Sequence, residues 1–477
     1  MKRIVVVGAG ASGVTVAVSL TRAATSPLEI VLVDPRAEPG HGLAHGTRHP
    51  DHRLNAPAPI HTIYPDAPLH FVEWVRDTRL TEADPGAVAA NGSIYTRRLD
   101  FGRYMAGECD RHARSNPSGS RIEHVRDRAV RALRTAAGIE LELADGRRLA
   151  AERCVLAMGW NEVGVPAPLR AIVDRPGWIG DPWDLGRIAA IPRGARVLLM
   201  GSGLTACDTF AALRAQGHRG PVIALSRRGL RPGPQSGFPS RLTSVWGMLR
   251  DPSPAFLQRH PDPTSVRAVM RALRRDIAAL DPATASWHEP FDELRDAVTH
   301  LWPRLSVSEQ QRGVRHAKGW YDTFRFRNPP QIQQIVDDGV AGGHLRFLAG
   351  RVREARAVDG VLEIAYDARA SGAPQTERID VVINCTGPQP RPSASRNPLW
   401  LSLIADGLVR DHPCGVGIDV DADCRTLDRD GHVNHDLLAV GPPTTGAFGE
   451  ASAVPYVARQ VLDALGAMLG EPVAVHR

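Results

Sequence analysis

Two glycine-rich turns, each placed behind a short β-rich run, constrain the fold of this 477-residue chain more than any other feature. Residues 3–7 lead into Gly-Ala-Gly-Ala-Ser-Gly at 8–13, and residues 195–200 lead into Gly-Ser-Gly-Leu-Thr-Ala at 201–206. In such a strand–turn–helix unit the first glycine permits the sharp turn, the second lets the backbone approach a pyrophosphate, and the third position lets the helix pack closely on the sheet. The helix N-terminus then holds the anion. The repeated pattern predicts two dinucleotides bound to one polypeptide.

Both turns supply the residues that we expect to contact the cofactors. They are Gly8, Gly10, Ser12 and Gly13 in the first turn, and Gly201, Gly203, Leu204 and Thr205 in the second. The second turn also has a plainer interpretation, as an ordinary strand–turn–helix corner without a ligand.

The charge at the end of each following strand distinguishes the two predicted cofactors. Asp34 ends the second strand of the first unit, where a carboxylate accepts hydrogen bonds from both ribose hydroxyls, which favours FAD or NAD. The corresponding place in the second unit holds Ser226, Arg227 and Arg228. Guanidinium groups match phosphate oxygens, so this site favours NADPH. NADH stays open, because either arginine can point to solvent.

Two further glycine-containing segments indicate that the first domain is discontinuous. A strand at 153–158 ends at Gly159, and strand-to-glycine patterns recur at 381–388 and 437–448. A returning segment of this kind meets the ribityl chain and ring of a flavin. The residues predicted to contact the cofactors here are Gly159, Gly387, Gly441, Gly446, Ala447 and Phe448.

The predicted fold is α/β, with two Rossmann-like dinucleotide-binding domains, a discontinuous FAD domain and a helical insertion, as in a two-dinucleotide-binding flavoprotein. Residues 1–160 form the first part of the FAD-binding domain and 161–230 the core of the NAD(P)H-binding domain. Residues 231–345 form the helical insertion, a candidate substrate region, and 346–477 return to the FAD domain. Within the insertion, residues 265–279 carry apolar side chains at helical spacing, which predicts a core-facing helix.

The loop at 40–47 and the segment at 54–58 are candidates for wrapping a flavin ring, because loops with little side chain approach a flat ligand closely. Leu54 and Asn55 are the predicted contacts, and the Asn55 amide is a candidate catalytic group at the ring edge. The alternative is a glycine-rich surface loop. Six histidines between residues 41 and 70 fit neither a helix face nor a zinc module, so we expect no metal.

The tract at 320–329 is rich in aromatic and cationic residues. Arg325 and Arg327 are the further candidate catalytic residues, in a pocket for a planar or anionic substrate. An interdomain strut is an equal alternative.

Composition excludes several classes of protein. The net charge is +6, but the arginines are interleaved with acids, so we expect no nucleic-acid partner. An anionic small-molecule substrate is favoured by electrostatic steering.

The six cysteines lack metal or disulfide spacing, which is typical of free thiols in the cytoplasm. No run of about 18 apolar residues predicts a membrane span, and a turn starting at residue 8 leaves no room for a signal peptide. The oligomeric state stays open.

The ordered motifs resemble the FAD/NAD(P)-binding monooxygenase family that contains bacterial FAD-dependent urate hydroxylases and nitrosuccinate-forming aspartate N-monooxygenases. The resemblance extends over nearly the whole chain. It is carried by the two glycine turns and by the segments 54–57, 101–104, 224–229, 383–388 and 441–448.

This resemblance implies that NAD(P)H reduces FAD and that reduced FAD captures O2 as a C4a-hydroperoxide, which hydroxylates a small nucleophilic substrate. The expected substrate is urate, attacked at C5, because the aspartate enzymes tend to be longer. Arg325 or Arg327 would then pair with the purine oxygens. One alternative is N-hydroxylation of aspartate or another amine. Others are an NAD(P)H:acceptor reductase that never oxygenates, and a flavin-bound sensor without turnover.

Overall fold

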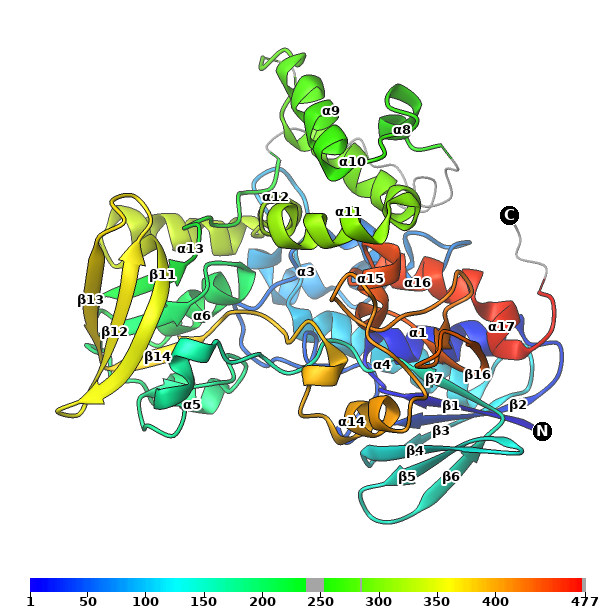
Figure 1. Cartoon of the computed structure of the whole chain (residues 1–477). Helices are drawn as coiled ribbons and strands as arrows, with labels where there is room; N and C mark the ends of the chain where they lie inside the picture. The colour runs from blue at the N-terminus through cyan, green and yellow to red at the C-terminus, as the bar shows by residue number, and fades with distance from the viewer. Residues whose placement is uncertain (237–252, 284, 474–477) are drawn as a thin grey trace.

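The chain folds into two sheet-centred units and a group of helices above their junction (Figure 1). The computed structural model describes residues 1–236, 253–283 and 285–473. Neighbouring strands run parallel at the centre of both sheets, and helices cover them. The predicted α/β class with two dinucleotide-binding-type domains is confirmed.

The first sheet joins the two ends of the chain. Its strands lie in the order β15 (Arg425–Leu427), β16 (Val433–Ala439), β7 (Arg153–Leu156), β1 (Lys2–Val7), β2 (Leu28–Val33) and β3 (Arg121–Val125). Only β15 is antiparallel to its neighbour. Because β16 pairs directly with β7, the returning C-terminal segment completes the first unit, as the glycine pattern predicts.

Each face of the first sheet has its own core. One core contains side chains of α1 (Ala11–Ala23), α2 (His70–Asp77), α3 (Leu80–Ala83), α4 (Arg98–Arg114), α16 (Val454–Asp463) and α17 (Leu465–Leu469). The opposite core contains side chains of α14 (Pro398–Ala405) and of a separate antiparallel sheet, β4 (Ala129–Thr135), β5 (Gly138–Leu143) and β6 (Arg148–Ala151). Strands β5 and β6 pair with each other as an antiparallel hairpin.

The second sheet builds the middle of the chain. Its strands lie in the order β13 (Pro374–Ile379), β12 (Val361–Ala368), β11 (Leu345–Val358), β10 (Val222–Ser226), β9 (Val197–Met200), β14 (Val381–Asn384) and β8 (Trp178–Ile179). One face packs against α5 (Leu185–Ala189), α6 (Leu204–Ala215) and α13 (Pro330–Ala341).

These pairings correct two predicted domain boundaries. Strand β11 pairs with β10, and β14 pairs with β9, so residues 345–384 lie in the second sheet and not in the returning part of the first domain. Helix α13 packs on α6, so the insertion ends before residue 330 and not at 345. Sequence patterns give the existence of a hairpin, but they do not give the sheet that it joins, because strand pairing is long-range.

The insertion has its own small core. It contains α8 (Ala255–Arg259), α9 (Val266–Ala278), α10 (His288–Leu301), α11 (Val307–Arg312), a π-helical turn at Gly313–Ala317 and α12 (Lys318–Arg325). Helix α9 buries Val269 and Leu273, as its periodicity predicts, against Phe291 and Leu294 of α10. Residues 237–252 and 284, which the prediction also assigns to the insertion, lie outside the described residues. Helix α15 (Thr445–Phe448), on the returning segment, lies beneath this group (Figure 1).

Candidate functional site

The first glycine turn has the backbone geometry that a dinucleotide requires. Gly8 has φ = +99°, and a Cβ atom there would lie 2.5 Å from the Ala157 carbonyl oxygen, so only glycine fits. Helix α1 begins after Gly10 without a side-chain cap, so its first N–H groups have no side-chain acceptor. The Asp34 carboxylate accepts a hydrogen bond from the Ala9 N–H at 3.0 Å, which places it beside the turn. These residues fit a pyrophosphate and a ribose.

The second glycine turn repeats this geometry. Gly201 has φ = +115°, and a Cβ atom there would collide with the Cys385 carbonyl oxygen. Helix α6 also begins without a side-chain cap, after Gly203. A Cβ atom at Gly203 or Gly387 would meet no protein atom within 4 Å, so both residues border open space. This space is where a second dinucleotide fits.

A cavity of about 1780 Å³ connects the two units and the insertion. It brings together many of the predicted site residues, namely Leu54, Asn55, Gly201, Gly203, Leu204, Thr205, Ser226, Arg227, Arg228, Arg325, Arg327 and Gly387. Other predicted residues do not line it, namely Gly8, Gly10, Ser12, Gly13, Asp34, Gly159, Gly441, Gly446, Ala447 and Phe448. Two of this second group nevertheless lie together, since the Ser12 hydroxyl is 2.9 Å from the position of a Cβ atom on Gly441.

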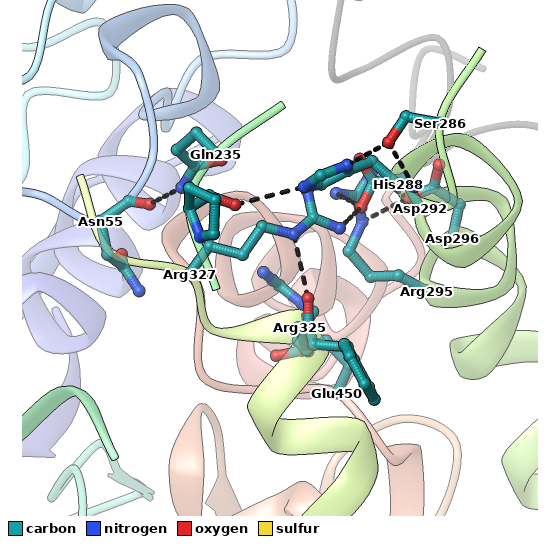
Figure 2. Close-up of polar contacts among 12 residues, drawn as sticks. Asn55, Gln235, Ser286, His288, Asp292, Arg295, Asp296, Arg325, Arg327 and Glu450 are labelled. Carbon is teal, nitrogen blue, oxygen red and sulfur yellow. Dashed lines mark hydrogen bonds and ion pairs between the residues drawn. The ribbon is translucent and has the colours of Figure 1, made fainter. Parts of the chain in front are cut away.

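Asn55 lies at the wall between the first unit and the insertion. Its backbone carbonyl accepts a hydrogen bond from the Gln235 side chain at 2.7 Å (Figure 2). The Asn55 side-chain amide makes no hydrogen bond with any residue that the structure describes, and it lines the cavity. Its donor and acceptor are therefore available to a ligand.

All three guanidinium nitrogens of Arg327 donate to described residues. Both of its terminal nitrogens donate to Asp292, at 3.2 and 2.6 Å, and its Nε donates to the Phe324 carbonyl at 2.9 Å (Figure 2). Arg295, which no sequence pattern singles out, lies 3.1 Å from Asp292 and 2.8 Å from Asp296. Asp292 thus joins α10 to the end of α12, and Arg327 holds the insertion in shape.

Arg325 differs from Arg327 because its two terminal guanidinium nitrogens donate to no described residue. Its Nε donates to Glu450 at 3.1 Å, and both side chains are largely buried. Its guanidinium lies 5.2 Å from the ring centre of Phe326 and 5.9 Å from that of Tyr456. Its two terminal nitrogens have no partner among the residues described, and Arg325 lines the cavity.

Comparison with known proteins agrees with this geometry. Residues 5–161 match a protein family described as FAD-NAD(P)-binding. No curated protein matches the chain.

Solved structures resemble nearly the whole chain at low sequence identity. An ornithine hydroxylase from Pseudomonas aeruginosa matches with 16% identity and a TM-score of 0.63, covering 98% of this chain and 99% of its own. An ornithine N-hydroxylase from Kutzneria sp. 744, with reduced FAD, NADP+ and L-ornithine, has 15% identity, a TM-score of 0.64 and 98% coverage of both chains. A cadaverine monooxygenase from Erwinia amylovora, bound to FAD, has 12% identity and a TM-score of 0.61, covering 99% of this chain and 96% of its own. At these identities the likeness shows a shared fold.

An ion pair ties the FAD-NAD(P)-binding unit to the second unit. Arg98, at the start of α4, contacts Asp208 of α6 at 2.6 Å, and both side chains are largely buried at the cavity. Burial raises the pKa of Asp208, and Arg98 opposes that rise. Neither Arg98 nor Asp208 was predicted as a site residue, because no local pattern joins residues 110 positions apart.

The two predicted phosphate-binding arginines have different surroundings. Arg228 donates to the carbonyl of His316 in the π-helical turn at 3.5 Å, and one of its terminal nitrogens is 2.5 Å from the position of a Cβ atom on Gly319 of α12. Arg227 is exposed, lines the cavity and has no hydrogen bond or ion pair with any described residue. Arg227 is therefore the freer of the two.

Histidines of the FAD-NAD(P)-binding unit pack in its interior near the cavity. Burial lowers the pKa of His52 to about 3 and that of His61 to about 4. The His61 ring lies 5.4 Å from that of Phe101.

Within the part of the chain that the structure describes, the one group with metal-ligand spacing is Asp428, Asp430 and His432, away from the cavity. All six cysteines are buried free thiols. No helix in the same residues has the length and apolar character of a membrane span.

Proposed function

We propose that the chain is a flavin-dependent, NAD(P)H-consuming monooxygenase that hydroxylates the nitrogen of a small amine. The observation that carries this proposal is the single cavity at which the second glycine turn, the 54–57 segment and the insertion meet. Such a space allows a nicotinamide, a flavin ring and a substrate to be neighbours. The similarity in fold to amine hydroxylases, over 98% of the chain, gives independent support.

This proposal replaces urate, the main substrate expected from the sequence, with the N-hydroxylation alternative. The solved structures described above are named as hydroxylases of ornithine and cadaverine, and none of them is named for urate. The overall reaction is that R–NH2, O2, NAD(P)H and a proton give R–NHOH, water and NAD(P)+. One oxygen atom enters the amine, and the nicotinamide supplies the two electrons that reduce the other to water.

The first turn would hold FAD, with the pyrophosphate at the N-terminus of α1 and the adenosine ribose at Asp34. When bound, FAD supplies the hydride acceptance and oxygen transfer. The α6 N-terminus would hold the NAD(P)H pyrophosphate, with Ser226 and Arg227 near its ribose. Asn55 would orient the reacting groups at the flavin edge, and the insertion would exclude water from them.

Substrate-dependent turnover tests the proposal. The purified, FAD-loaded protein is mixed with NADPH or NADH and with lysine, ornithine, aspartate, cadaverine or urate under 18O2. We expect NAD(P)H oxidation to match formation of a hydroxylamine that carries one 18O atom. If every substrate leaves all electrons in H2O2, the protein is an NAD(P)H:acceptor reductase and the proposal fails. Labelled product from urate alone would restore the urate assignment.

A further inference from the structure

The wall that the insertion contributes to the cavity contains three arginines and three carboxylates in one cluster. The arginines are Arg295, Arg325 and Arg327, and the carboxylates are Asp292, Asp296 and Glu450. When all six are ionised the cluster is neutral, so its charge alone does not require an anion. The distribution of hydrogen-bond donors is more informative.

Arg325 is the guanidinium of this cluster whose two terminal nitrogens both lack an acceptor among the described residues. The terminal nitrogens of Arg327 both donate to Asp292, and those of Arg295 contact Asp292 and Asp296. Arg325 uses Nε alone, which leaves four N–H donors on its two terminal nitrogens without an acceptor among the described residues. Since its side chain is only 13% exposed, these donors are poorly served by bulk solvent.

The surroundings of Arg325 fix its orientation. Glu450 accepts from Arg325 through Oε2, while its Oε1 accepts from the Ser452 hydroxyl at 2.9 Å. The rings of Phe326 and Tyr456 lie near the guanidinium. The Nε edge is therefore occupied, and the edge formed by the two terminal nitrogens remains.

We infer that Arg325 binds a carboxylate group of the substrate, so that the protein accepts an amino acid in preference to the corresponding amine without a carboxylate. A carboxylate matches the two parallel donors of a guanidinium in a planar, bidentate arrangement. A single negative charge also suits a neutral cluster better than the double charge of a phosphate. The inference rests on the proposed function for the reaction, but not for the binding.

Equilibrium binding to the FAD-loaded protein tests the inference without turnover. Calorimetry compares lysine with cadaverine, which differs from lysine by the loss of its carboxylate, and adds ornithine, aspartate, glutarate and inorganic phosphate. We expect at least one carboxylate ligand to bind, lysine to bind at least tenfold more tightly than cadaverine if either binds, and phosphate to compete poorly. No carboxylate binding at millimolar concentration, equal binding of lysine and cadaverine, or equal competition by phosphate would overturn the assignment.

Three variants test whether Arg325 is the residue that binds the carboxylate. Arg325→Gln should weaken binding of the carboxylate ligands by tenfold or more and leave cadaverine binding unchanged, and Arg325→Lys should recover only part of the affinity. Arg271→Gln, on the exposed side of α9 and away from the cavity, is the matched control that should change neither. If Arg325→Gln keeps the wild-type preference, the inference is wrong. If it loses bound FAD, the Arg325→Lys comparison decides.

The same panel separates this inference from the proposed function. Binding that depends on Arg325, without any 18O-labelled hydroxylamine, would remove the proposed reaction and keep the carboxylate site. Equal rates of hydroxylation of lysine and cadaverine would keep the reaction and remove the site.

Discussion

The two glycine turns have nearly the same backbone but opposite charges beside them. Gly8 and Gly201 have φ values of +99° and +115°, and each packs against a carbonyl of the adjoining parallel strand's end. Beside the first turn lies a buried carboxylate, Asp34, and beside the second lies the exposed Arg227. We propose that the fold provides a pyrophosphate cradle in both units, and that these single side chains select the nucleotide that binds in each one.

The largest expected effect comes from breaking the shared backbone geometry. Gly8→Val should abolish FAD retention and greatly reduce soluble protein, because it combines a strained φ, worth about 1–3 kcal/mol, with a backbone collision. Gly203→Ala is the matched control, since its Cβ atom meets open space and should leave the folded protein yellow. FAD content by absorbance measures both. A Gly8→Val protein with full FAD content would show that the turn geometry is not required.

The next largest effect is expected at Asp34, the carboxylate beside the first turn, on the affinity for FAD. Asp34→Ala should raise the FAD dissociation constant by roughly 10- to 100-fold, since charge-assisted hydrogen bonds contribute about 1.5–3 kcal/mol each. Asp34→Asn keeps the shape and should lose less. Flavin fluorescence titration of the apoprotein measures the constants. Unchanged affinity in Asp34→Ala would place the ribose elsewhere.

A smaller effect is expected at the arginines beside the second turn, on the KM for NADPH. Arg227→Ala should raise the KM for NADPH by about tenfold, with little change for NADH, if the phosphate contact contributes about 1.5 kcal/mol or more. Arg228→Ala should change this ratio less and instead lower the melting temperature, because Arg228 contacts the His316 carbonyl of the insertion. Equal effects of Arg227→Ala on both nucleotides would contradict a phosphate contact.

The smallest expected effect is a loss of folding stability at acidic pH, caused by the buried residues His52 and His61. His52 and His61 have folded pKa values of about 3 and 4, below the unfolded value of about 6.5, so the unfolded state binds more protons as the pH falls. Their contribution to stability is complete above pH 6.5 and is lost as the pH falls toward 4. Each should cost about 1 kcal/mol between pH 6.5 and 5.5. Urea unfolding at a series of pH values should show a shallower slope for His61→Gln than for the exposed control His432→Gln. An equal slope would mean that His61 is not held neutral.

Local chemistry explains which features the sequence could predict. The turns, Asp34 and α9 depend on residues close together in the chain, so their patterns are visible without a structure. The return of β16 to the first sheet was predicted because its glycine turn repeats the same local pattern.

Long-range pairing explains what the sequence could not provide. Arg325 and Arg327 look equivalent in the tract at 320–329, and only their partners, Glu450 and Asp292, distinguish them. Arg98 and Asp208 meet across 110 residues. The boundary placed at residue 346 was wrong for the same reason, since nothing local reveals that β11 pairs with β10.

Anaerobic titration of the FAD-loaded protein with NADPH or NADH tests most directly whether both dinucleotides meet in one cavity. We expect a yellow protein whose flavin absorbance bleaches with one equivalent of reduced nicotinamide and returns when air is admitted. A protein that stays colourless in saturating FAD, or whose bound flavin ignores both nucleotides, would contradict it.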